Sequence, residues 1–92
     1  MKMTMEKFND VWDALEDDPI RRANLKLRSD LMMQITDIIQ ERGLKQQEAA
    51  ELLEISQPRV SALLKGKIDE FRLDMLVDIA HRLGLRVSIK SA

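Results

Sequence analysis

The chain of 92 residues carries 15 Lys+Arg against 16 Asp+Glu, and 45% of its residues are hydrophobic while only 3% are aromatic. This length allows one small domain, and the apolar residues, chiefly Leu, Ile, Val, Met and Ala, favour packed helices over a β-sandwich. The lack of cysteine excludes disulfides and thiolate chemistry. No apolar run approaches the ~20 residues of a membrane span, and the N-terminus has no signal-peptide pattern, so we expect a cytoplasmic protein.

Charge is distributed unevenly along the chain, although the net charge is only −1. Residues 1–18 hold two positive and six negative side chains, whereas residues 21–45 hold six positive and three negative ones. A near-neutral total therefore does not exclude a local phosphate-binding face. We divide the chain into an acidic N-terminal arm or helix at 1–18, a central domain at 19–84, and a C-terminal strand and tail at 85–92.

Apolar residues spaced three and four apart predict helices through most of the chain. The first covers about residues 5–15. Asp18 followed by Pro19 is typical of the start of the next helix, because Asp caps free amides and proline fits the first turn. From there to residue 42 the spacing supports either one long helix or two helices joined near Ser29.

The later helices are short and their ends carry clear signals. Gly43 supplies a left-handed stop to the preceding helix. A further helix covers about residues 46–53, and another begins behind Ser56, whose hydroxyl can cap it. A last helix covers about residues 73–83. We therefore expect an all-α fold of about five helices.

The period changes after the last helix. Leu85, Val87 and Ile89 alternate with polar residues, which is the spacing of a strand with one apolar face. A lone short strand is not stable in water, so it needs a partner, most simply its own copy across a two-fold axis. We expect a homodimer closed partly by this strand.

Residues 43–66 hold the most informative pattern in the chain. Two short helices lie three residues apart, and Ala50 is small enough for the second helix to cross the first closely. Apolar residues fall where such a pair must meet, namely Ala49, Leu53, Ile55, Val60 and Leu63. This is a helix-turn-helix pattern. The alternative, a plain helical hairpin, does not explain why this spacing coincides with a polar face of Gln, Arg and Ser.

This stretch resembles the Xre/Cro-type helix-turn-helix family. The matching features are Gln46 at the start of the first helix, Glu48 in its first turn, Ala50 at the crossing, the pair 56–57 that opens the second helix, and the exit at 63–67. The resemblance implies a lambda-repressor-like, all-helical DNA-binding domain. Residues 31–44, 56–61 and 73–85 also look like the subgroup that includes antitoxins of the HigA type.

Two positions depart from the family pattern. The turn position that usually holds glycine is Glu54, which must either adopt an unfavourable positive φ or use a slightly different turn. The residue before Gln46, often a Ser or Thr cap in the family, is Lys45, which gives up a side-chain cap but places a cation near the expected phosphate path.

In the resembled family, the first, second and sixth residues of the recognition helix often read bases, and these are Gln57, Pro58 and Ala62 here. Gln57 can pair bidentately with adenine, whereas Pro58 and Ala62 offer only apolar contact. Arg59 and Ser61 add hydrogen-bonding groups. We therefore assign base contact to Gln57, Arg59, Ser61 and Pro58, with phosphate contact as the alternative for Arg59.

The helix ends and loop supply the expected contacts to the DNA backbone. Lys45 and Gln46 lie at the start of the first helix of the pair, and Lys65 and Lys67 follow the second. Cations and amides at such positions usually bind phosphate. These four residues are predicted to position the protein on DNA without reading sequence.

Nothing in the sequence predicts an enzyme, a metal site or a cofactor. His81 stands alone, because the chain has no cysteine and no second histidine. No Gly-rich phosphate loop and no nucleophile with a paired base is present.

The leading interpretation is a homodimeric, sequence-specific regulator that occupies a palindromic double-stranded DNA operator. The resemblance further implies an autorepressing antitoxin that holds a basic ribonuclease-type toxin, and the acidic run 16–18 suits such a partner. Two alternatives remain: a protein-interaction module that neutralises a basic toxin without significant DNA binding, and a phage or mobile-element repressor with no toxin partner.

Overall fold

A single long helix, α2 (Pro19–Glu41), forms the axis of the structure, and the computed structural model describes residues 18–88. The Asp18 carboxylate accepts a hydrogen bond from the Ile20 amide at 2.9 Å, so this N-terminus is capped as the sequence predicts. The helix continues through Ser29 without a break, which settles the choice between one helix and two. It ends before Gly43, which has a φ of +63°.

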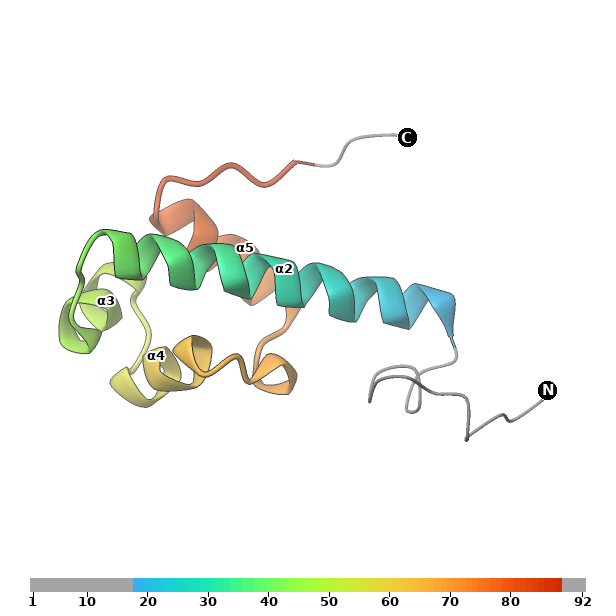
Figure 1. Ribbon diagram of the computed structural model, residues 1–92, viewed down its shortest axis with the longest axis horizontal. Coiled ribbons are helices and arrows are strands. Elements are labelled where there is room, and N and C mark those ends of the chain that lie inside the picture. The colour runs from blue at the N-terminus through green and yellow to red at the C-terminus, as the bar shows by residue number, and fades with distance from the viewer. Residues whose placement is uncertain (1–17, 89–92) are drawn as a thin grey trace.

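Three further α-helices and one 3-10 helix follow α2 within the described residues. They are α3 (Gln46–Leu53), α4 (Gln57–Leu64), the 3-10 helix η2 (Ile68–Glu70) and α5 (Leu73–Arg82). Figure 1 shows α4 and α5 on different sides of α2. Helix α2 packs on α5, α4 and η2, and α3 packs on both α4 and α5. Residues 18–88 thus form an all-α domain of four helices and one 3-10 turn.

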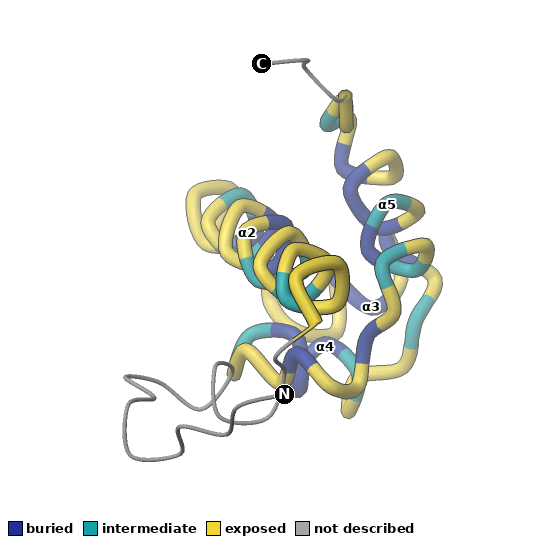
Figure 2. Tube along the Cα trace, turned by 90° about the vertical axis from the view of Figure 1, so that its right-hand side faces the viewer, coloured by how far each residue is buried: buried dark blue, intermediate teal, exposed yellow. Residues whose placement is uncertain are grey.

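The core is one apolar cluster to which all of these elements contribute, seen as the buried segments that face one another in Figure 2. Its fully buried side chains include Phe71, Ile35, Ile39, Leu53, Leu63, Leu76, Leu83 and Val60. The N-terminal part of α2 lies outside this cluster. Ile20 is 79% exposed and Leu27 is 40% exposed, although both continue the apolar spacing of the buried residues.

A polar contact joins the ends of α2 and α5. The guanidinium Nη2 of Arg42 donates to the carbonyl oxygen of Leu83 at 2.7 Å. This carbonyl belongs to the last turn of α5, where backbone acceptors have no partner within the helix. The contact therefore closes the bundle at the end opposite to the exposed start of α2.

One sequence-based expectation differs from the described structure, and another lies outside it. Residues 85–88 form no strand, although Leu85 packs against the core. A strand needs a hydrogen-bonded neighbour, and residues 18–88 of a single copy supply none. Ile89 and the predicted helix at 5–15 lie outside the described residues, so the expected five helices correspond to four within residues 18–88.

Candidate nucleic-acid interface

Helices α3 and α4 form the helix-turn-helix that the sequence predicts. Ala49 of α3 and Val60 and Leu63 of α4 are fully buried where the two helices pack together, and Ala50 is also buried. The turn consists of residues 54–56. These contacts hold α4 at the surface while α3 supports it from behind, which is the arrangement that presents a helix to a DNA groove.

The local sequence sets both ends of α4. The Ser56 hydroxyl accepts a hydrogen bond from the Arg59 amide at 3.2 Å, and Pro58 occupies the first turn, where its missing N–H costs nothing. At the other end, the amides of Gly66 and Lys67 donate to carbonyls of the last turn, and Gly66 has a φ of +73°. The helix is therefore short and fixed at each end.

The turn contains Glu54, for which the sequence left two conformations open: a positive φ or a slightly different turn. Glu54 adopts the left-handed conformation, with φ 58° and ψ 43°. Its carboxylate Oε2 accepts from Arg82 Nη1 at 2.6 Å, an ion pair that ties the turn to the end of α5. Lys45, as expected, provides no side-chain cap to α3, and the Glu48 carboxylate instead accepts from the Lys45 amide at 2.8 Å.

Most of the predicted base-contacting residues lie on one outward stripe of α4. Gln57 and Pro58 are exposed and Ser61 is half-buried. Ala62, which the resemblance places at a base-reading position, is only 7% exposed because it faces the core. It is therefore unavailable to a DNA base in this conformation.

Arg59 lies on a different side of α4 from the other predicted base contacts. At about 100° per residue, it is about 200° round the helix from Gln57. Its Nη1 donates to the carbonyl oxygen of Glu70 at 2.7 Å, and its guanidinium lies 5.5 Å from the centre of the Phe71 ring. Both partners follow Arg59 by more than ten residues, so the sequence around α4 carried no signal for this contact.

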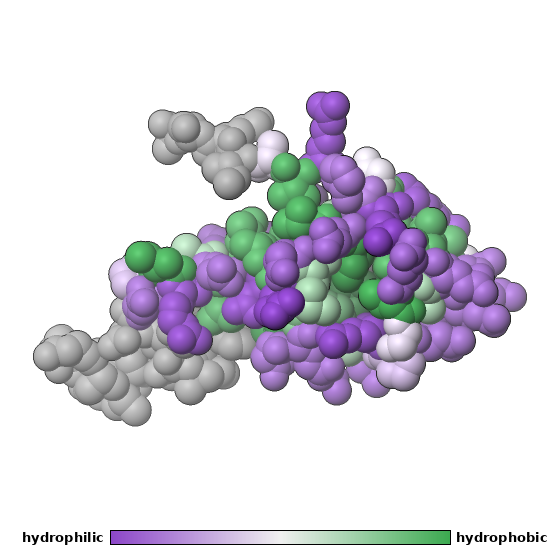
Figure 3. Space-filling view, turned by 180° about the vertical axis from the view of Figure 1, so that it is seen from behind, coloured by the Kyte–Doolittle hydropathy of each residue, from purple (hydrophilic) through white to green (hydrophobic). Residues whose placement is uncertain are grey.

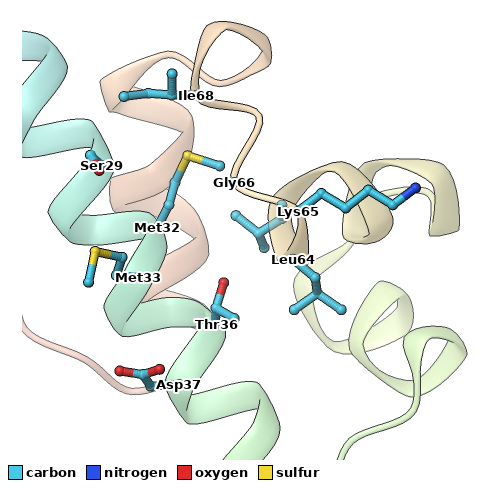
Figure 4. A pocket seen from close by; sticks show the side chains of 10 residues that line it. Ser29, Met32, Met33, Thr36, Asp37, Leu64, Lys65, Gly66 and Ile68 are labelled. Atoms are coloured by element: carbon cyan, nitrogen blue, oxygen red, sulfur yellow. The ribbon is translucent and has the colours of Figure 1, made fainter. Parts of the chain in front are cut away.

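The predicted phosphate-contacting residues are all exposed at the helix ends. These residues are Lys45, Gln46, Lys65 and Lys67. Within residues 18–88, none of the three lysine ammonium groups makes a hydrogen bond or an ion pair, so each can neutralise a phosphate without losing a protein partner. Figure 4 shows the Lys65 side chain pointing away from α2.

A shallow apolar groove lies beside the end of α4. It has a volume of about 230 Å³ and runs between α2, which contributes Met32 and Met33, and the segment Leu64–Gly66 (Figure 4).

In the described part of the chain, no group of three or more His, Cys, Asp or Glu side chains is placed to hold a metal ion. From behind, polar side chains cover much of the surface, and apolar ones form separate patches along its length (Figure 3).

A comparison with protein-family models agrees with this geometry. The model of a helix-turn-helix domain family matches residues 14–91, which is most of the chain. The chain therefore belongs to this helix-turn-helix domain family. DNA binding is the activity that such a domain supports, and the family is typically without catalytic activity.

The family match stops at this level, since it gives no support for the HigA-type subgroup. None of the curated proteins matches the chain. Among the helices between residues 18 and 88, none combines the length and the apolar character needed to cross a bilayer.

Proposed function

We propose that the protein is a sequence-specific DNA-binding regulator that represses transcription by occupying an operator. The observation that carries this proposal is an outward polar stripe on α4 together with exposed lysines at the ends of the helix-turn-helix, which make no hydrogen bond or ion pair with any described residue. Base edges require polar side chains on a supported helix, and the DNA backbone requires cations on either side of it.

In this proposal, Gln57 and Ser61 read base edges by hydrogen bonding. Gln57 can bind adenine bidentately, and the hydroxyl of Ser61 can donate or accept. Pro58 offers apolar contact to a thymine methyl group. Arg59 was the fourth predicted base contact, and its contacts with Glu70 and Phe71, away from the stripe, favour a different role.

The backbone contacts are assigned to Lys45, Gln46, Lys65 and Lys67. Each lysine that neutralises a phosphate releases condensed counterions, so the affinity falls as salt concentration rises. Because these contacts go to phosphate, they are expected to contribute equally on operator and on unrelated DNA.

We further propose that the regulator acts as a homodimer on a palindromic site. The alternation of Leu85, Val87 and Ile89 supports pairing of two tails across the two-fold axis. Two recognition helices would then lie about 34 Å apart, or a multiple of this distance. Deleting residues 86–92 keeps Leu85 in the core and should raise the dimer dissociation constant in analytical ultracentrifugation; an unchanged constant would exclude the tail from the interface.

Selection of bound sequences from random DNA by the purified protein tests the central proposal. A recovered motif with two symmetric half-sites is expected, and recovery of unrelated sequences would contradict sequence-specific binding. This one experiment also gives the half-site distance that the dimer requires.

Two substitutions then separate the assigned roles. Gln57→Ala should weaken operator binding by about 1–3 kcal/mol and relax one base preference. Lys65→Ala should weaken binding to operator and scrambled DNA alike and flatten the salt slope by about one unit for each protomer bound. Arg86→Ala removes the same charge from the tail, on the other side of α2 from α4 (Figure 1), and should leave the slope unchanged. Identical behaviour of the Gln57 and Lys65 variants would contradict the assignment.

A narrower proposal is that the regulator is an antitoxin that represses its own operon. Its support is the sequence resemblance of residues 31–44, 56–61 and 73–85, together with the acidic balance of residues 1–18, which suits a basic ribonuclease-type toxin. We expect an adjacent reading frame that encodes a basic protein. The full chain should capture this protein in a pull-down, and removal of residues 1–18 should abolish the capture. Normal repression with no such neighbour would favour a phage or mobile-element repressor, and toxin capture without a gel shift would favour a pure interaction module.

A further inference from the structure

Arg59 contacts the short segment between α4 and α5 from one side. This arginine reaches back from the first half of α4, donates to the carbonyl oxygen of Glu70 at 2.7 Å, and stacks its guanidinium over Phe71. The Phe71 ring is fully buried, so it presents a fixed surface to the cation. Arg59 thereby connects the recognition helix to a part of the chain eleven residues further on.

Arg28 of α2 donates hydrogen bonds to the same segment from the other side. Its Nη1 donates to the Phe71 carbonyl at 3.0 Å and lies 3.5 Å from the Ile68 carbonyl. Its Nε donates to the Asn24 side chain at 2.9 Å, one turn earlier on α2, which fixes the direction of the guanidinium. Arg28 is half-buried, so its hydrogen bonds are partly shielded from water.

These two arginines add hydrogen bonds to a segment that has little regular structure of its own. The 3-10 helix η2 has three residues, and the carbonyls of Glu70 and Phe71 accept bonds from arginine side chains on two different helices. The Ile68 carbonyl already accepts from the Phe71 amide at 3.3 Å and lies 3.5 Å from Arg28 Nη1. Backbone acceptors near the core need partners, and a planar guanidinium with five donors suits two or more of them. Arg28, Arg59, Phe71 and the carbonyls of Ile68 and Glu70 thus form what we call the arginine clasp.

We propose that Arg28 and Arg59 are positioning residues that set the angle of the recognition helix on α2 through the arginine clasp. This inference rests on the proposed DNA-binding function, and it assigns Arg59 to orientation of α4 rather than to base or phosphate contact. Hydrogen bonds to base edges tolerate only about 0.5 Å and 10–20° of misplacement. If η2 loses its hydrogen bonds to the arginines, α4 can shift by more than this and lose its hydrogen bonds to the bases.

The test replaces each arginine with methionine, which keeps a long apolar stem and removes the donors. Arg28→Met and Arg59→Met should each raise the Kd for the selected operator by about tenfold, which corresponds to about 1.4 kcal/mol. The Kd for scrambled DNA should change by less than about twofold, and the salt slope by less than about half a unit, because no phosphate contact is removed. Base preference should weaken across the whole half-site rather than at one position.

The double variant supplies the sharpest measurement. If the two arginines hold one segment, releasing either side already frees it, so the double variant should remain near tenfold. Two independent contacts would multiply to about a hundredfold. A multiplied effect would overturn the proposal.

Arg42→Met serves as the matched control, since Arg42 also donates to a backbone carbonyl but at the end of α2 away from η2. It should lower thermal stability without changing operator Kd, and far-UV circular dichroism should show every variant folded at the assay temperature. If a methionine variant unfolds, Arg28→Lys and Arg59→Lys keep the positive charge and a donating ammonium but lose the planar guanidinium, and they should give smaller changes of the same pattern.

Two results would overturn the assignment directly. A salt slope flattened by about one unit for each protomer bound, in Arg59→Met alone, would make Arg59 a phosphate contact. Loss of preference at a single base pair, with Arg28→Met unchanged, would make it a base contact. If the unmodified protein selects no sequence at all, the proposed function fails first, and the two failures are therefore distinguishable.

Discussion

Glu54 offers a direct measure of the strain in the turn between α3 and α4. At its φ of 58° and ψ of 43°, an L-residue with a Cβ costs about 1–2 kcal/mol relative to the right-handed region, and this cost applies equally to alanine. Glycine escapes it but loses roughly 0.5–1 kcal/mol more conformational entropy on folding. Glu54→Gly should therefore be more stable than Glu54→Ala by about 1 kcal/mol.

The ion pair with Arg82 does not affect this comparison, because both variants lose it. The two side chains are 67% and 43% exposed, so the pair itself contributes at most about 1 kcal/mol to the difference between either variant and the parent protein. The order of the Gly and Ala variants thus reports on the backbone alone.

Urea unfolding followed by circular dichroism, at one fixed protein concentration, measures the difference, and the melting temperatures should differ by about 4–8 °C per kcal/mol. Glu51, exposed within α3, provides the control position. There alanine should be more stable than glycine by about 1 kcal/mol, which is the opposite order. Finding alanine more stable than glycine at position 54 as well would refute the claim that the turn holds a left-handed residue.

The other stability predictions concern α4 and its support. Ser56→Ala should lower the free energy of unfolding by about 1 kcal/mol, because the Arg59 amide loses its cap, and Ser56→Asp should restore most of this. Leu63→Ala should cost about 2–5 kcal/mol at a fully buried position, measurable as a lower urea midpoint, and an effect below about 1 kcal/mol would contradict its place in the core. Asp18→Ala should cost about 1 kcal/mol at the start of α2, with the exposed Asp78→Ala as a neutral comparison in thermal melts.

Signals that act between near neighbours in the chain are sufficient to predict the helix-turn-helix. Ser56 and Pro58 define the start of α4 through hydrogen bonding and backbone geometry that involve only adjacent residues. Gly43 ends α2 for a similarly local reason. Apolar spacing then identifies Ala49 and Leu63 as buried, because a pair of short helices has few other ways to cover those side chains.

The same kind of pattern predicts a helix or a strand without showing which of its apolar residues find a packing partner. Ile20 and Leu27 share the spacing of the buried residues of α2, yet both are exposed because α5 and η2 pack further along the helix. The alternating tail likewise predicts a strand, but residues 85–88 alone form none, since strand pairing depends on a second chain segment.

The sequence by itself determined the ends of α3 and α4, the start of α2, and that α3 and α4 form a helix-turn-helix, because caps, left-handed residues and apolar periodicity act within a few residues. Only the tertiary structure decided what the side chains of Arg59 and Glu54 contact and that Ala62 is buried. Arg59 contacts Glu70 and Phe71, and Glu54 pairs with Arg82 twenty-eight residues away. Which way a polar side chain on a short helix turns depends on carbonyls and rings supplied by distant segments, and these come together only when the chain has packed.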